Sequence, residues 1–155
     1  MNNTLTEQQK EIIRENVLSI ISHLQELSLQ TMEYGDIVQW KKIAFVEIDK
    51  IEDESVEIRK LFMSLFEDFG LEYDYGVAVG NWYEGCSDEH LLKVFAFENE
   101  RLLRNLNAFN YSILKKIDET KPEQYDNNYI KKRACDWLDY LAHRLYANVL
   151  THLIK

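Results

Sequence analysis

Apolar positions along the first part of the chain predict an amphipathic helix. Within residues 13–27, apolar side chains recur at intervals of three and four, which places them on one face of an α-helix. Thr4 and Thr6 are each followed three residues later by Glu or Gln, the spacing of a capping box. We therefore expect this helix to begin near one of the two threonines and to end at Gly35.

A second apolar pattern is longer. The residues that form it are separated alternately by four and three positions: Ala44, Ile48, Ile51, Ser55, Ile58, Phe62, Leu65 and Phe69. Asp36 is a suitable N-cap, and Gly70 stands where a glycine ends a helix. The acidic stretch at residues 52–54 leaves two interpretations, one helix from about 36 to 69 or two helices hinged near residues 53–55.

The rest of the chain predicts two more helices. Ser87 caps the first, whose apolar seam runs to about residue 117, and Asn99 falls where an apolar residue is expected. A buried Asn in such a seam fixes the register of neighbouring helices or lines a polar pocket. The last helix begins near the capping-box pair Thr120 and Glu123 and carries apolar residues on one face as far as Leu153.

Residues 70–86 differ from the other segments. They hold four of the five glycines, and apolar and polar residues alternate from 71 to 80, as in a strand. We expect an extended or short β-like excursion there. The predicted fold is an all-α bundle of four to five helices with this one Gly-rich excursion, formed as a single helical domain over residues 1–155.

The composition indicates in which cellular compartment the protein is expected. The chain has 46% apolar residues, one proline and two cysteines, which have no zinc or disulfide spacing. It has no apolar segment of the length that signal peptides or membrane spans require. We therefore expect a cytoplasmic protein without a membrane partner.

The net charge of −9 is unevenly distributed. Residues 1–86 contain 17 acidic and seven basic residues, a net charge of −10, whereas residues 87–155 carry a net charge of +1. The acidic half would repel a phosphate backbone, so no direct nucleic-acid binding is expected, and it would attract a basic protein.

These features favour a protein that acts by binding another protein. The leading hypothesis is an inhibitor or immunity protein that neutralises a basic toxin or nuclease, because such targets are cationic and acidic inhibitors mimic phosphate charge. The expected contact residues are acidic groups for steering and aromatic groups for anchoring: Glu52, Asp53, Glu54, Glu57, Tyr73, Tyr75, Trp82 and Tyr83.

Two other classes of function stay open. Glu54 and Glu57 have the Glu-x-x-Glu spacing with which helical nucleotide pyrophosphatases hold magnesium, which gives a carboxylate-rich metalloenzyme as one alternative. The second carboxylate pair of those enzymes is missing at the expected distance. The other alternative is a homodimer or larger oligomer, structural or regulatory, in which the seam at 44–69 pairs with a second copy.

No catalytic pattern, cofactor motif or metal site is predicted. Asp136, Asp139 and His143 share a helix face at intervals of three and four, but that face lies roughly opposite the apolar seam of the same helix. We interpret them as a solvated surface stripe.

Overall fold

The computed structural model describes residues 4–33, 35–73, 87–119 and 127–154. Helix α1 spans Glu7–Glu33 and helix α2 spans Ile37–Asp68. Helix α3 (Asp88–Phe109) continues through a π-helical turn, η1 (Asn110–Leu114), into α4 (Lys115–Glu119). Helix α5 (Asn127–Asn148) is followed by a short 3-10 turn, η3 (Leu150–His152).

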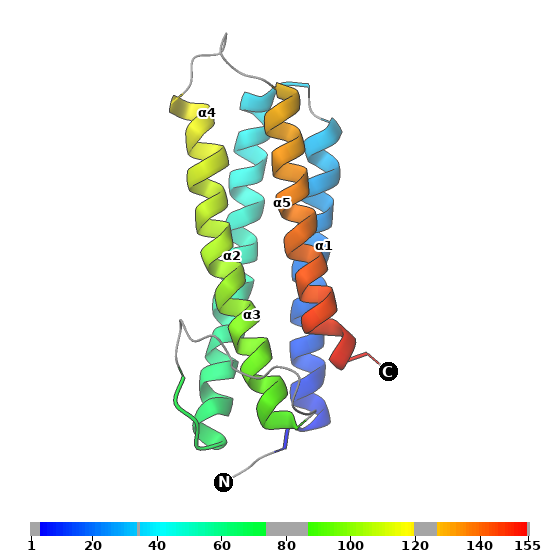
Figure 1. The fold of residues 1–155 in the computed structure, drawn as a ribbon, viewed down its shortest axis with the longest axis vertical. Coiled ribbons are helices and arrows are strands. Elements are labelled where there is room, and N and C mark those ends of the chain that lie inside the picture. The colour runs from blue at the N-terminus through cyan, green and yellow to red at the C-terminus, as the bar shows by residue number, and fades with distance from the viewer. Residues whose placement is uncertain (1–3, 34, 74–86, 120–126, 155) are drawn as a thin grey trace.

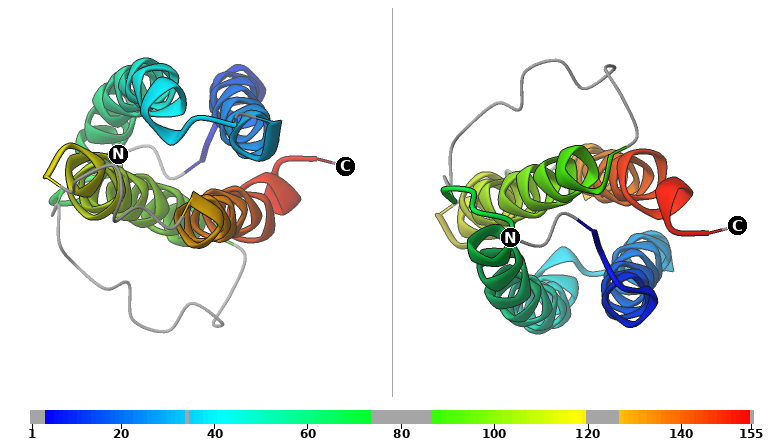
Figure 2. Two further views of the ribbon diagram at one scale, coloured as in Figure 1. Left: turned by 90° about the horizontal axis from the view of Figure 1, so that it is seen from above. Right: turned by 90° about the horizontal axis from the view of Figure 1, so that it is seen from below.

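The long helices run alternately up and down (Figure 1). Helix α1 packs against α2 and α5, and α3 packs against the same two helices, so each rod has two neighbours around a common core. Seen end on, α1 and α2 lie on one side and α3 with α5 on the other (Figure 2). The expected all-α bundle is confirmed, and the described segments contain no strand and no helix long and apolar enough to cross a membrane.

Local side-chain signals set the helix ends. Thr6 and Gln9 form a reciprocal capping box, with each backbone N–H donating to the other side chain at 2.9 and 3.1 Å. The Asp36 carboxylate accepts from the Val38 N–H at 2.9 Å, which caps α2. Gly70 follows α2 with φ of 72°, a left-handed conformation that glycine adopts without strain. The capping box expected for α5 lies outside the described residues.

Helix α2 is one uninterrupted helix, which decides between the two interpretations of residues 36–69. All eight seam residues, from Ala44 to Phe69, are buried within the bundle. The acidic stretch at 52–54 does not break the helix because it lies beside the seam and not in it. The seam that motivated the oligomer hypothesis is therefore used inside the chain, and an oligomer would have to form through another surface.

A pair of polar residues joins α2 to α3 in the middle of the core. Asn99 and Ser55 are both buried. The Ser55 hydroxyl donates to Asn99 Oδ1 at 2.6 Å, and Asn99 Nδ2 donates to the Ser55 carbonyl at 3.0 Å. Asn99 therefore acts as a register device between two helices, the first of the two roles that the sequence suggests for it.

The residues on either side of Asn99 are buried acids with cationic partners. Glu98 accepts from Arg144 Nε at 2.9 Å and from Asn148 Nδ2 at 3.2 Å, both near the end of α5. Glu100 accepts two hydrogen bonds from the Arg59 guanidinium on α2, at 2.6 and 2.7 Å. Three consecutive residues of α3 thus bond to its two neighbours.

Replacing Asn99 by Ala is expected to destabilise the bundle. The change leaves the Ser55 hydroxyl buried without its acceptor, which costs about 1–3 kcal/mol of the free energy of unfolding. Urea unfolding followed by circular dichroism measures this loss.

The matched control removes both polar groups at once. S55A/N99L leaves no unpaired group at this position, so its free energy of unfolding should lie closer to that of the wild type than to that of N99A. If N99A and the wild type unfold at the same urea concentration, the pair does not stabilise the bundle.

Candidate functional site

The outer face of α2 carries a second regular stripe, opposite the core seam. Its members are again separated by three and four positions and are all exposed: Val46, Asp49, Asp53, Val56, Lys60 and Met63. Because the core seam is buried, the rotation of α2 is fixed and this stripe points to solvent. We call it the outer α2 stripe.

Three apolar side chains of the stripe are accessible to solvent. Val46 is 51% exposed, Met63 40% and Val56 38%. The carboxylates of Asp49 and Asp53 lie between Val46 and Val56. Apolar contact area surrounded by polar groups is the usual composition of a protein interface, and a single exposed apolar residue alone would not indicate one.

Negative charge is concentrated around the stripe. Residues 47–57 contain six acidic residues and one lysine, and among the residues that the structure describes four of these acids have no bond to α1: Asp49, Glu52, Asp53 and Glu57. Burial raises the pKa of Glu52 above its ordinary value of 4.5, and the neighbouring carboxylates of Asp49 and Asp53 raise it further. The like charges on this surface therefore repel each other, and a positively charged partner would relieve the repulsion.

Glu54 does not belong to this surface, although the sequence prediction includes it. Its Oε1 accepts from the Ser19 hydroxyl at 3.0 Å and lies 3.4 Å from His23 Nε2. The other ring nitrogen of His23 lies 3.4 Å from Glu47 Oε2. The two glutamates and the histidine form part of the contact between α1 and α2, so their charges face the neighbouring helix.

Glu57 points to solvent, in a different direction from Glu54. It is exposed and pairs with Lys60 at 2.9 Å. The structure therefore does not direct Glu54 and Glu57 at a common point, as a magnesium site would require. Among the side chains that the structure describes, no group of three or more His, Cys, Asp or Glu residues is arranged to hold a metal ion.

Tyr73, one of the predicted anchors, packs onto the bundle. Its hydroxyl donates to Glu100 Oε2 at 2.6 Å, and its ring meets that of Phe66 edge-on, with centroids 5.0 Å apart. The side chain thus completes the environment of the buried Glu100 carboxylate. Tyr75, Trp82 and Tyr83 lie outside the described residues, and their role as anchors stays a prediction.

The acidic stripe of α5 is a surface feature. Asp136, Asp139 and His143 are all exposed. Asp136 accepts from Lys132 at 2.8 Å, an i,i+4 pair on the same helix.

The apolar members of the outer α2 stripe were not among the predicted contact residues. The signal was present, since Val46, Val56 and Met63 keep the three-four spacing of the core seam but shifted by two positions. Two apolar patterns on one helix can be told apart only when it is known which of them faces the core. The structure supplies that information, because it shows the seam from Ala44 to Phe69 buried.

Glu52→Gln is expected to stabilise the protein at neutral pH. The pKa of Glu52 is raised in the folded state, so the folded protein binds a proton at this carboxyl more tightly than the unfolded chain does. Glu52 therefore stabilises the fold at low pH, and this contribution is lost as the pH rises above 4.5. Removing the charge should raise the free energy of unfolding by about 0.2–0.5 kcal/mol, the size of a like-charge pair on a helix. Urea unfolding at neutral and at acidic pH tests this, because the gain should vanish once the wild-type carboxyl is protonated.

NMR titration of the Glu52 carboxyl separates the two causes. D49N/D53N should lower the pKa toward 4.5 but leave the part due to burial, whereas D136N/D139N, which removes the same charge on α5, should leave it unchanged. A wild-type midpoint at or below 4.5 would contradict the electrostatic description of the stripe.

The chain was compared with models of protein families, with curated proteins and with solved structures, and none of the three comparisons finds a significant match.

Proposed function

We propose that this protein acts by binding a basic protein through the outer α2 stripe. The observation that supports the proposal most directly is the combination of three exposed apolar side chains with the exposed carboxylates of Asp49 and Asp53 on one regular helix face. The charge steers a cationic partner to the face, and the apolar groups supply contact area once the partner has arrived.

The contact set differs in part from the one expected from sequence. Glu52, Asp53 and Glu57 stay in it, and Asp49 joins them because it lies between Val46 and Asp53. Glu54 leaves the set because it bonds to α1. The surface is continuous along one helix, so it fits a partner with a groove or a concave basic site.

Within this class, the proposed partner is a toxin or nuclease in the cytoplasm, and the protein is its inhibitor. Enzymes that act on nucleic acids present cationic clefts to phosphates that repeat at short intervals. Carboxylates at positions 49, 53 and 57 repeat every helical turn, about 5–6 Å apart along the axis. Such a row can occupy a phosphate-binding cleft and exclude its substrate.

Removal of charge from the stripe should abolish partner capture. The experiment compares the wild type with D49N/D53N as baits in a lysate of the source cells, with quantitative mass spectrometry of what is retained. D136N/D139N on α5 removes the same charge from another exposed helix face and serves as the control. We expect a basic protein that the wild type and the control retain and that D49N/D53N loses, with weaker retention as salt rises.

A second pair of variants tests the apolar contacts. V56S/M63S should also lose the partner, whereas I12S/L18S, which changes two α1 residues of similar exposure, should not. If the partner's enzymatic activity falls on addition of the purified wild-type protein, the inhibitor assignment holds. Equal capture by all five proteins would refute the role of the stripe.

A further inference from the structure

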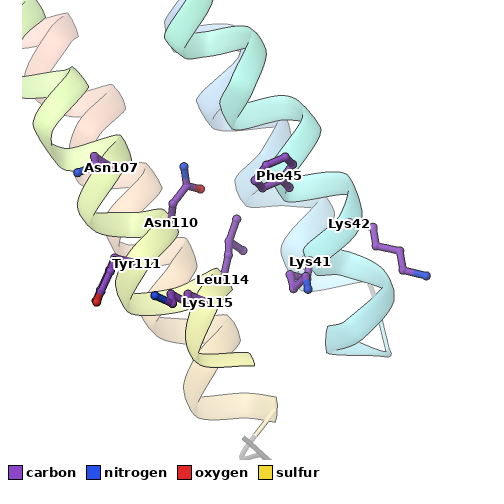
Figure 3. A pocket seen from close by; sticks show the side chains of 8 residues that line it. All are labelled: Lys41, Lys42, Phe45, Asn107, Asn110, Tyr111, Leu114 and Lys115. Atoms are coloured by element: carbon purple, nitrogen blue, oxygen red, sulfur yellow. The ribbon is translucent and has the colours of Figure 1, made fainter. Parts of the chain in front are cut away.

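A cavity of about 540 Å³ opens between the first turns of α2 and the continuous rod of α3, η1 and α4. Small-molecule sites in proteins have volumes of roughly 300–1,000 Å³, so the cavity is of suitable size for one. Figure 3 shows Phe45 reaching into it from α2, and Asn110 and Leu114 reaching into it from the opposite rod. The cavity is separate from the outer α2 stripe, which begins one residue further along the helix.

The rim of the cavity is positively charged. Lys41, Lys42 and Lys115 line it, and of the described residues that do so none is acidic. The Lys115 ammonium group lies 4.5 Å from the ring centroid of Tyr111, and Figure 3 shows it turned toward that ring and away from Phe45. The chain as a whole has a net charge of −9, but three lysines line this cavity. The cavity therefore favours an anion.

The interior of the cavity is largely apolar. Phe45 is 59% exposed and presents its ring to the space, and the buried Leu114 forms part of the opposite wall. An exposed aromatic ring beside a cavity is a surface on which a flat ligand stacks. The cavity therefore fits an anion that carries an aromatic body better than it fits a bare inorganic anion.

The π-helical turn supplies the polar groups. The Lys115 N–H donates to the Asn110 carbonyl, five residues earlier, so the helix is one residue wider here than an α-helix. Ile113 and Leu114, the last two residues of this turn, are both buried. π-Helical turns inside α-helices occur frequently at functional sites.

Asn110 has an unused hydrogen-bonding group. Its Oδ1 is shielded from solvent and accepts no hydrogen bond among the residues that the structure describes. Nearly all such buried acceptors in proteins have a donor, and rotation of the amide lets Asn110 offer either its oxygen or its nitrogen to the cavity. Asn107, one turn earlier, lines the same wall and offers a second carboxamide. A carboxamide pairs well with the edge of a nucleobase, which has donors and acceptors side by side.

We infer that this cavity binds a nucleoside phosphate. The base stacks on Phe45 and meets the Asn110 carboxamide at its edge, and the phosphate lies among the lysines at the rim. Such a ligand matches the positive charge, the aromatic surface and the unpaired Asn110 Oδ1 of the cavity. A fatty acid would leave the amide unpaired, and free phosphate would leave the apolar walls uncovered.

Isothermal titration calorimetry tests the inference with the ribonucleoside monophosphates and ATP as probes. Adenosine, inorganic phosphate and decanoate are the comparison ligands. We expect saturable binding of at least one nucleotide, with adenosine and inorganic phosphate each binding at least tenfold more weakly, because each lacks one of the two groups that the cavity recognises. Binding should shift the NMR signals of the Asn107 and Asn110 side-chain amides.

Matched variants locate the site. K41A/K115A should weaken nucleotide binding by about tenfold or more, since charge-assisted hydrogen bonds to the phosphate are lost. F45A should weaken both nucleotide and nucleoside, because stacking is independent of the phosphate. K50A/K60A removes the same charge from exposed positions further along α2 and should leave the affinity unchanged.

Three results would overturn the inference. They are no saturable binding of any nucleotide in the probe set, inorganic phosphate or decanoate binding as tightly as the best nucleotide, and equal affinity of K41A/K115A and K50A/K60A. Because D49N/D53N leaves every cavity residue in place, nucleotide binding by that variant separates this site from the proposed protein-binding function.

Discussion

The arrangement of the bundle depends on three consecutive buried polar residues in the middle of α3, at positions 98–100. Successive residues of a helix point about 100° apart, so the three side chains cannot face the same neighbour. Glu98 bonds to α5, whereas Asn99 and Glu100 bond to α2. Burial raises the pKa of Glu98 even though the positive charge of Arg144 opposes the change, so desolvation outweighs the ion pair. Such groups stabilise the fold only when every partner is in place, which restricts α3 to one rotation and one axial position relative to two helices.

The same constraint determines which residues of α2 face outward. Ser55 and Arg59 are the α2 partners of the polar residues in α3, and they lie one helical turn apart. Their bonds fix the rotation of α2 more tightly than apolar packing alone, because aliphatic side chains accept several packing arrangements whereas a hydrogen bond accepts one. With Ser55 directed at the core, Asp53 and Val56 have to point away from it. The outer α2 stripe is thus a consequence of a core interaction on the opposite side of the helix.

Local signals explain why much of this fold can be predicted from the sequence. Helix caps such as Thr6 with Gln9 and Asp36 depend on residues two or three positions apart, and the α2 seam depends on spacing alone. The candidate site is less predictable, because neighbouring carboxylates on one helix point in different directions once a partner helix is present. Glu54 and Glu57 look alike in sequence, yet one contacts α1 and the other faces solvent. The π-helical turn has no comparable local signal in the sequence, which contains neither proline nor glycine between residues 109 and 115.

Helix α2 carries two surfaces of opposite charge, and their separation decides whether they influence each other. Lys42 at the cavity and Asp49 in the outer stripe are the nearest exposed charges of the two surfaces, seven residues apart or about 10 Å along the axis. At physiological salt the screening length is about 8 Å, so salt weakens the direct electrostatic coupling between them without abolishing it. The intervening Glu47 pairs with His23 of α1 and with Lys50 of its own helix. Coupling through a rotation of α2 is opposed by the hydrogen bonds of Ser55 and Arg59. An anion in the cavity would therefore affect a basic partner on the stripe through its charge and not through a movement of the helix.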